Sequence, residues 1–247
     1  MTEPQVVVAE SATALADDVA ARLIALLAEI VSDGGSAHLA VTGGSILEQV
    51  FAALAAADSS AVAWERVHLW WGDERFVAPD SPDRNDRAAM AAGLGSLGLD
   101  AADVHAMPAV IQHYGDDPEF AAASYAGQLR AAAPDDELLR LDVVLLGIGP
   151  DGHCASLFPH HLALDCDDLV IAVHNSPKPP PTRITLGYRT LNAARHVWFI
   201  ASGESKADAV RKALSGADFH ETPSARPRGT ESTLWLIDQQ AASHLPH

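Results

Sequence analysis

The sequence predicts an α/β protein built on a doubly wound, mostly parallel β-sheet with helices on both faces. Short apolar runs rich in β-branched residues, such as residues 143–146, are typical of strands buried on both faces of a parallel sheet. These runs alternate along the chain with helical patterns, as they do in successive βαβ units. Several of the runs end in glycine-containing polar loops, where open α/β sheets place their binding sites.

The expected elements follow one another in a regular order. Ser11 can cap the first helix, because its hydroxyl can accept a hydrogen bond from a free N–H group of the first turn. No internal repeat or linker interrupts the pattern, so we expect a single domain over residues 1–247. The expected strands cover residues 6–8, 39–41, 67–71, 143–146, 169–173, 196–201 and 233–237. The expected helices cover residues 11–31, 46–56, 85–97, 118–132 and 206–214.

Composition excludes several classes of protein. A net charge of −17 argues against a nucleic-acid partner, because such binding is driven by neutralising phosphates. No apolar run is long enough to span a membrane, and the first residues lack the pattern of a signal peptide. The two cysteines, Cys154 and Cys166, suggest no disulfide framework. We therefore expect a cytoplasmic enzyme with no membrane partner, either a monomer or a weak homodimer.

Residues 42–45, Thr-Gly-Gly-Ser, lie between an expected buried strand and an expected helix. Gly43 and Gly44 allow the backbone to wrap around an anion, and the Ser45 hydroxyl can donate to it. The helix N-terminus adds unpaired N–H groups and a positive dipole. The same four residues also fit an ordinary turn between a strand and a helix, so the motif alone does not decide between these interpretations.

The segment that follows residues 143–146 contains Gly147, Gly149 and Gly152, and so matches the dinucleotide-binding pattern G-x-G-x-x-G. Pro150 argues against a dinucleotide because it has no N–H group, and Asp151 would repel a pyrophosphate. His153 follows Asp151 by two residues, which makes a titratable pair at the end of a buried strand.

Further charged residues lie at comparable places. Asp73, Glu74 and Arg75 follow the expected strand 67–71, where they form either a functional cluster or a solvated turn. Arg183 ends a proline-stiffened segment, and Lys206 follows the expected strand 196–201. Because loops after parallel strands meet at one edge of the sheet, we expect these groups to converge. Together with His153 they suit general-base chemistry on a sugar phosphate.

The combined motifs are those of a known family. They are T-G-G-S at 42–45, W-G-D-E-R-F-V at 71–77, S-P-D-x-N at 81–85, G-I-G-x-D-G-H-x-A-S-L-F-P at 147–159, P-P-x-R-I-T at 180–185 and G-x-x-K at 203–206. Over nearly the whole chain the sequence resembles the 6-phosphogluconolactonase family, hydrolases of the oxidative pentose phosphate pathway. The resemblance implies hydrolysis of 6-phospho-D-glucono-1,5-lactone to 6-phosphogluconate, with no metal and no cofactor.

The resemblance also implies roles for individual residues. His153 would be the general base that activates water, and Asp151 would orient its imidazole. Arg75 would offset charge that develops on the lactone carbonyl oxygen. The residues expected to bind the substrate and its phosphate are Gly43, Gly44, Ser45, Asp73, Glu74, Arg183 and Lys206.

Two other functions and a metal site are alternative interpretations of these residues. The related sugar-phosphate deaminases share the fold, but they have D-E-Y in place of residues 73–75 and a glutamate where this chain has Phe158, which cannot transfer protons. A sugar-phosphate-sensing domain would have no need of both His153 and Arg75. A zinc site can be imagined from residues that lie within one short stretch, although their spacing fits no common zinc pattern. These residues are His153, Cys154, His160 and His161.

Overall fold

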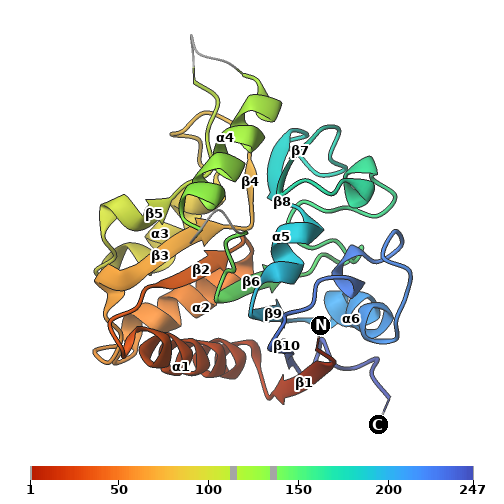
Figure 1. The fold of residues 1–247 in the computed structure, drawn as a ribbon. Coiled ribbons are helices and arrows are strands. Elements are labelled where there is room, and N and C mark those ends of the chain that lie inside the picture. The colour runs from red at the N-terminus through yellow and green to blue at the C-terminus, as the bar shows by residue number, and fades with distance from the viewer. Residues whose placement is uncertain (1, 112–115, 134–137, 247) are drawn as a thin grey trace.

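The computed structural model describes residues 2–111, 116–133 and 138–246 (Figure 1). The main sheet contains β1 (Pro4–Ala9), β2 (Ala37–Val41), β3 (Val67–Trp71), β5 (Val104–His105), β6 (Val143–Gly147), β9 (His196–Ala201) and β10 (Ser232–Asp238). A second sheet contains β4 (Asp73–Arg75), β7 (Val170–Val173) and β8 (Arg183–Leu186). The α-helices are α1 (Ala12–Val31), α2 (Ser45–Ala56), α3 (Asn85–Ala92), α4 (Pro118–Ala131), α5 (Tyr188–Ala193) and α6 (Ala207–Leu214).

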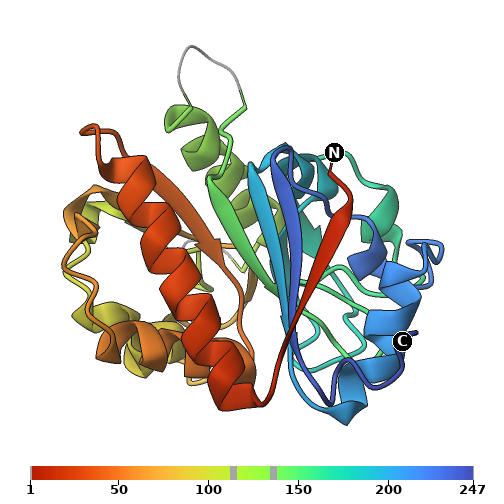
Figure 2. The ribbon, with the colours of Figure 1, turned by 90° about the horizontal axis from the view of Figure 1, so that it is seen from below.

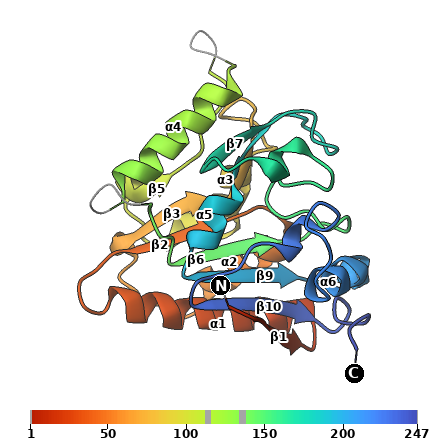
Figure 3. The same cartoon turned by 45° about the vertical axis from the view of Figure 1, so that its right-hand side comes forward.

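The seven strands of the main sheet run in the order β1-β10-β9-β6-β2-β3-β5, and every neighbouring pair is parallel. Figure 2 shows α1 on one side of this sheet and α6 on the other, and Figure 3 shows β6, β9 and β10 side by side. These features confirm the predicted fold class. The central strand β6 is apolar and fully buried over residues 143–146, as expected for a strand covered on both faces.

Local sequence signals account for the helix ends. The Ser11 hydroxyl accepts the N–H of Ala14 at the start of α1, so the predicted cap is confirmed. The helix expected over residues 85–97 instead ends at Ala92 and continues as a short 3-10 turn. Gly93 has a φ of 157°, and a Cβ atom at this position would overlap the Phe51 carbonyl, so the chain needs a glycine and a change of direction here.

The second sheet is the main departure from the expected architecture. Residues 73–75 were expected in a loop, but they form strand β4, which pairs in antiparallel register with β8. The strand expected at 169–173 exists as β7, but it pairs with β8 and not with the main sheet. Figure 1 shows this sheet beside α4. The apolar run at 169–173 predicted β7 without indicating its partner, whereas no strand was predicted at the positions of β4 and β8.

The segment after Gly152 and the character of the helices bear on two classes of function. No helix follows Gly152 directly, and the next helical element is the 3-10 turn η5 (Leu162–Asp165), so the glycine pattern lacks the helix N-terminus that a dinucleotide site requires. Across residues 2–111, 116–133 and 138–246, none of the helices has the length and apolar character needed to cross a bilayer.

Candidate active site

A cavity of about 260 Å³ lies where β2, β6 and β9 reach their carboxyl ends. It brings together every residue expected in the site except Asp151 and Glu74. The loops after the parallel strands therefore converge on one edge of the sheet, as the sequence predicted. The predicted residues that line the cavity are Gly43, Gly44, Ser45, Asp73, Arg75, His153, Arg183 and Lys206.

The glycine loop presents the start of α2 to this cavity. Gly44 is the N-cap residue of α2 with a φ of 134°, and a Cβ atom there would meet open space. Because Gly44 has no side chain to cap the helix, the first N–H groups of α2 and the positive end of its dipole are free to bind an anion. A side chain at Gly43 would overlap the Asn85 amide, so this glycine permits the close approach of α3.

Two arginines occupy opposed positions in the second sheet. Arg75 of β4 lies directly opposite Arg183 of β8 in the antiparallel register, and both side chains line the cavity. Like charges at opposed positions destabilise a sheet, which makes this pair costly unless an anion lies between them. Arg75 also has a buried Nε atom with no hydrogen-bond partner among the described residues. A bound anion would satisfy both requirements.

Arg183 is held in place by the proline-rich segment that precedes it. The side chain is 5% exposed, and its guanidinium donates to the backbone carbonyls of Lys178, Pro179 and Pro180 at 3.0–3.2 Å. Burial lowers the pKa of Arg183, an effect that nearby Asp73 opposes. These three contacts fix the Arg183 side chain against the proline-rich segment.

Lys206 adds a third cation to the cavity. Burial and the positive charge of Lys178 lower the pKa of Lys206, and the Asp151 carboxylate acts in the opposite direction. None of the carboxylates that the structure describes lies within ion-pair distance of its Nζ atom. With Arg75 and Arg183, Lys206 therefore forms a concentration of positive charge on a chain whose net charge is −17.

His153 and Asp151 form a close pair at the rim of the cavity. The Nδ1 atom of His153 lies 2.5 Å from Oδ1 of Asp151, which leaves Nε2 as the nitrogen that can accept a proton from a ligand. The Phe158 ring packs against the imidazole with ring centroids 4.7 Å apart. Phe158, noted above as the residue in place of a deaminase glutamate, thus helps to hold the imidazole in position.

Lys178 also lines the cavity, although it was not among the site residues predicted from the sequence. Its Nζ atom lies 3.2 Å from Oδ1 of Asp151 and 3.0 Å from Nδ1 of His153. Partial burial alone would raise the pKa of Asp151, but the hydrogen bond from His153 and the charges of His153 and Lys178 outweigh burial and hold this pKa well below its usual range. One signal was present in the sequence, because Lys178 is one of only three lysines and lies in the stiff segment before Arg183.

Glu74 and Asp73 take part in the architecture of the site in different ways. Glu74 is fully buried and does not line the cavity. Its carboxylate accepts the backbone N–H groups of Arg75, Asn85 and Asp86, which fixes the start of α3 beside β4. Burial raises the pKa of Glu74 to about 7, although the N–H donors oppose this change. Asp73 lines the cavity and accepts a hydrogen bond from another side chain, the Ser156 hydroxyl at 2.7 Å.

The side chains of the residues considered as zinc ligands contact different partners. His160 is exposed and lies 3.4 Å from the Glu221 carboxylate. His161 contacts the His174 carbonyl through Nε2 at 2.7 Å and accepts the Ala163 N–H through Nδ1. Cys154 is fully buried, and burial raises the pKa of its thiol. These side chains do not converge with His153 on a common point.

Comparisons with known proteins place the chain among sugar-phosphate enzymes. Residues 10–235 match the family model described as glucosamine-6-phosphate isomerases/6-phosphogluconolactonase. The chain is 47% identical to a 6-phosphogluconolactonase of Streptomyces coelicolor, with 98% of this chain and 95% of that protein covered. It is 42% identical to a 6-phosphogluconolactonase of Mycobacterium tuberculosis, with 91% and 92% covered.

The fold agrees with solved structures of similar proteins. The crystal structure of a 6-phosphogluconolactonase from Leishmania guyanensis superposes with a TM-score of 0.86 at 25% sequence identity, and all of both chains is covered. The chain therefore shares the overall fold of that solved structure.

Proposed function

The chain belongs to the glucosamine-6-phosphate isomerase/6-phosphogluconolactonase family, and we propose that it hydrolyses 6-phospho-D-glucono-1,5-lactone with His153 as the general base. It is an enzyme of the 6-phosphogluconolactonase type, as its similarity to proteins of that name over nearly the whole chain indicates. The observation that carries the mechanism is the Asp151–His153 pair, which lies at the same cavity as a cluster of cations.

The proposed reaction has two steps. Nε2 of His153 takes a proton from water as the water oxygen attacks the lactone carbonyl carbon, and the resulting negative oxygen faces Arg75. The bond between that carbon and the ring oxygen then breaks, and the imidazolium returns the proton to the ring oxygen. Asp151 holds Nδ1 of His153 and stabilises the imidazolium, as a carboxylate does in other histidine-based sites.

The phosphate has a separate binding region in this proposal. The first N–H groups of α2, with Gly44 and Ser45, would bind phosphate oxygens together with Arg183 and Lys206. Lys178 has a different task, since its ammonium lies against the Asp151 carboxylate and competes with His153 for it. Gly43 and Asp73 would shape the cavity wall, and Glu74 supports it from behind.

The proposed function is tested by measuring lactone hydrolysis through the protons that it releases, because the product acid ionises at neutral pH. We expect hydrolysis above the spontaneous rate, with no loss after extended dialysis against a chelator, because the proposed steps use only side chains. Activity that falls on dialysis and returns with zinc would contradict the metal-free mechanism. The absence of any rate above the spontaneous one would contradict the lactonase assignment.

Lys206→Ala should raise KM for the phosphorylated lactone by roughly 10–100-fold, the equivalent of losing one hydrogen bond to a charged group. It should barely change the slow hydrolysis of unphosphorylated gluconolactone, since that substrate has no phosphate to bind. Initial-rate kinetics on both substrates would measure this. Lys212→Ala is the matched control, because Lys212 is exposed on α6 and pairs with Asp208. Equal losses on both substrates would assign Lys206 another task.

Several expectations from the sequence stay part of this proposal. We infer that residues 1–247 act as one domain and that the protein works in the cytoplasm as a monomer or weak homodimer. We also infer that it has no nucleic-acid or membrane partner. Gel filtration across a range of protein concentrations would test the oligomeric state.

A further inference from the structure

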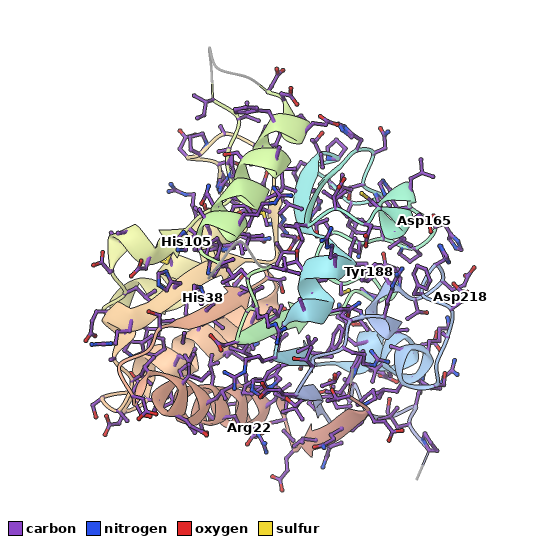
Figure 4. The ribbon with its side chains drawn as sticks, viewed as in Figure 1. Arg22, His38, His105, Asp165, Tyr188 and Asp218 are labelled. Atoms are coloured by element: carbon purple, nitrogen blue, oxygen red, sulfur yellow. The ribbon has the colours of Figure 1, made fainter. Side chains whose placement is uncertain are left out.

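A second cluster of titratable side chains lies away from the cavity. His68 is the second residue of β3, and the cavity residue Asp73 lies beyond the opposite end of that strand. Nδ1 of His68 lies 3.2 Å from Nε2 of His105 and 3.2 Å from Oδ1 of Asp103. Figure 4 labels His105 together with the nearby His38, which stacks on His68. The proposed lactonase chemistry uses none of these residues.

We propose that His68, Asp103 and His105 bind a divalent transition-metal cation of the zinc type. The three ligand atoms lie within 4.8 Å of one another. A tetrahedral zinc ion with metal–ligand distances near 2.0–2.1 Å separates its ligand atoms by about 3.3 Å. Nδ1 of His68 lies 3.2 Å from each of the other two atoms, which is close to this value, so a cation could bind all three atoms after a rearrangement of the His105 and Asp103 side chains.

A simple hydrogen-bond network explains the cluster less well. Nδ1 of a neutral His68 carries either one proton or none, yet both the His105 imidazole nitrogen and the Asp103 carboxylate lie at the same short distance from it. With a proton, the single N–H can point well at only one of His105 and Asp103. Without a proton, its lone pair faces the Asp103 carboxylate. A cation bound to all three atoms removes both conflicts.

The surroundings hold the imidazole rings in fixed planes. The His38 ring stacks on His68 with centroids 4.5 Å apart, and the Trp70 ring stacks on His105 at 3.8 Å. Trp70 also donates its indole N–H to Nδ1 of His38. Ligands that neighbouring rings and hydrogen bonds already orient lose little freedom when a metal binds.

The ligand set and its exposure favour a particular class of ion. Two imidazole nitrogens and one carboxylate suit zinc and similar transition metals, whereas magnesium and calcium prefer oxygen ligands. The side chains of His68 and Asp103 are 23% and 26% exposed, so an ion can reach them from solvent. With three protein ligands, the fourth coordination position is open to water.

The effect of such an ion would be structural. The ion would tie β5, the two-residue edge strand of the main sheet, to β3, joining residues 37 positions apart in sequence. A ligand that binds only the folded chain raises its stability in proportion to occupancy. Zinc should therefore raise the thermal midpoint of the metal-free protein while leaving the rate of lactone hydrolysis unchanged.

In the experiment, zinc is titrated into the metal-free full chain. Calorimetry measures the binding, and thermal unfolding measures its effect on stability. The absorption spectrum of bound Co²⁺ is a second probe, which reports tetrahedral geometry. Asp103→Asn and His105→Gln should each weaken zinc binding by at least the roughly 10–100-fold seen when a supporting residue of a metal site is removed. Each variant should keep wild-type lactonase activity, which shows that it has folded.

The matched control is His220→Gln, which removes an exposed histidine flanked by Asp165 and Asp218. We expect its zinc affinity and zinc-dependent thermal shift to equal those of the wild type. No zinc binding by the wild type would overturn the proposal. Zinc binding that Asp103→Asn and His105→Gln leave unchanged, or that His220→Gln abolishes, would do the same, because the ion would then be bound elsewhere.

Discussion

Replacing His153 by alanine should lower kcat for the phosphorylated lactone by about 10²–10⁴-fold, the usual contribution of a positioned general base. KM should change little, because the proposed phosphate contacts come from other segments of the chain. His153→Asn should fail to a similar extent, since an amide cannot accept the proton. Rates must be measured above spontaneous lactone hydrolysis. Retention of more than about a third of wild-type kcat would place the base elsewhere, with Asp73 the first residue to test.

The pH dependence gives an independent readout of the same base. Imidazoles titrate near neutral pH, whereas the pKa of Asp151 is held well below its usual range, so Asp151 stays ionised throughout the assay. The wild-type rate should therefore rise with pH as the general base loses its proton, and this rise should vanish in His153→Ala. His174→Asn is the matched control, because this exposed histidine also contacts a carboxylate, that of Glu119.

Gly149→Ala should lower kcat nearly as much as loss of the base, by roughly 10²-fold or more, while changing stability little. A Cβ atom at this position would overlap the His153 imidazole and the Asp151 carboxylate. The side chains can rotate away, so the protein should fold, but the pair would leave its position at the cavity. Steady-state kinetics and urea unfolding of the same preparation would separate the two effects.

The control for this substitution is Gly127→Ala in α4. A Cβ atom there meets nothing within 4 Å, and alanine is the better helix former. This variant should keep full activity and equal or higher stability. Wild-type kcat in Gly149→Ala would show that the observed Asp151–His153 geometry is not needed for the reaction.

Much of the fold could be predicted because its signals are local. Buried apolar runs located every strand of the main sheet except the two-residue β5, and Ser11 marked the start of α1. Most residues of the candidate site could also be predicted, because the binding loops of such proteins follow parallel strands and meet at one edge of the sheet. The sequence therefore determined that the main sheet is parallel, which edge of the sheet holds the candidate site, and which residue types gather at that edge.

Tertiary structure decided which distant segments meet. The pairing of β4 with β8 joins Arg75 to Arg183, and no local pattern records a contact across more than a hundred residues. Asp73 lines the cavity, whereas its neighbour Glu74 lies buried behind it. The difference arises because both residues belong to strand β4, and successive side chains of a strand point to opposite faces.

The role of Lys178 and the cluster around His68 have the same origin. Lys178 reaches Asp151 only because the stiff segment before Arg183 folds back over the β6 loop. Asp103 and His105 meet His68 only because β5 pairs with β3 at the sheet edge. Sequence periodicity reports which face of an element is buried, whereas the choice of neighbour depends on the packing energy of the whole chain.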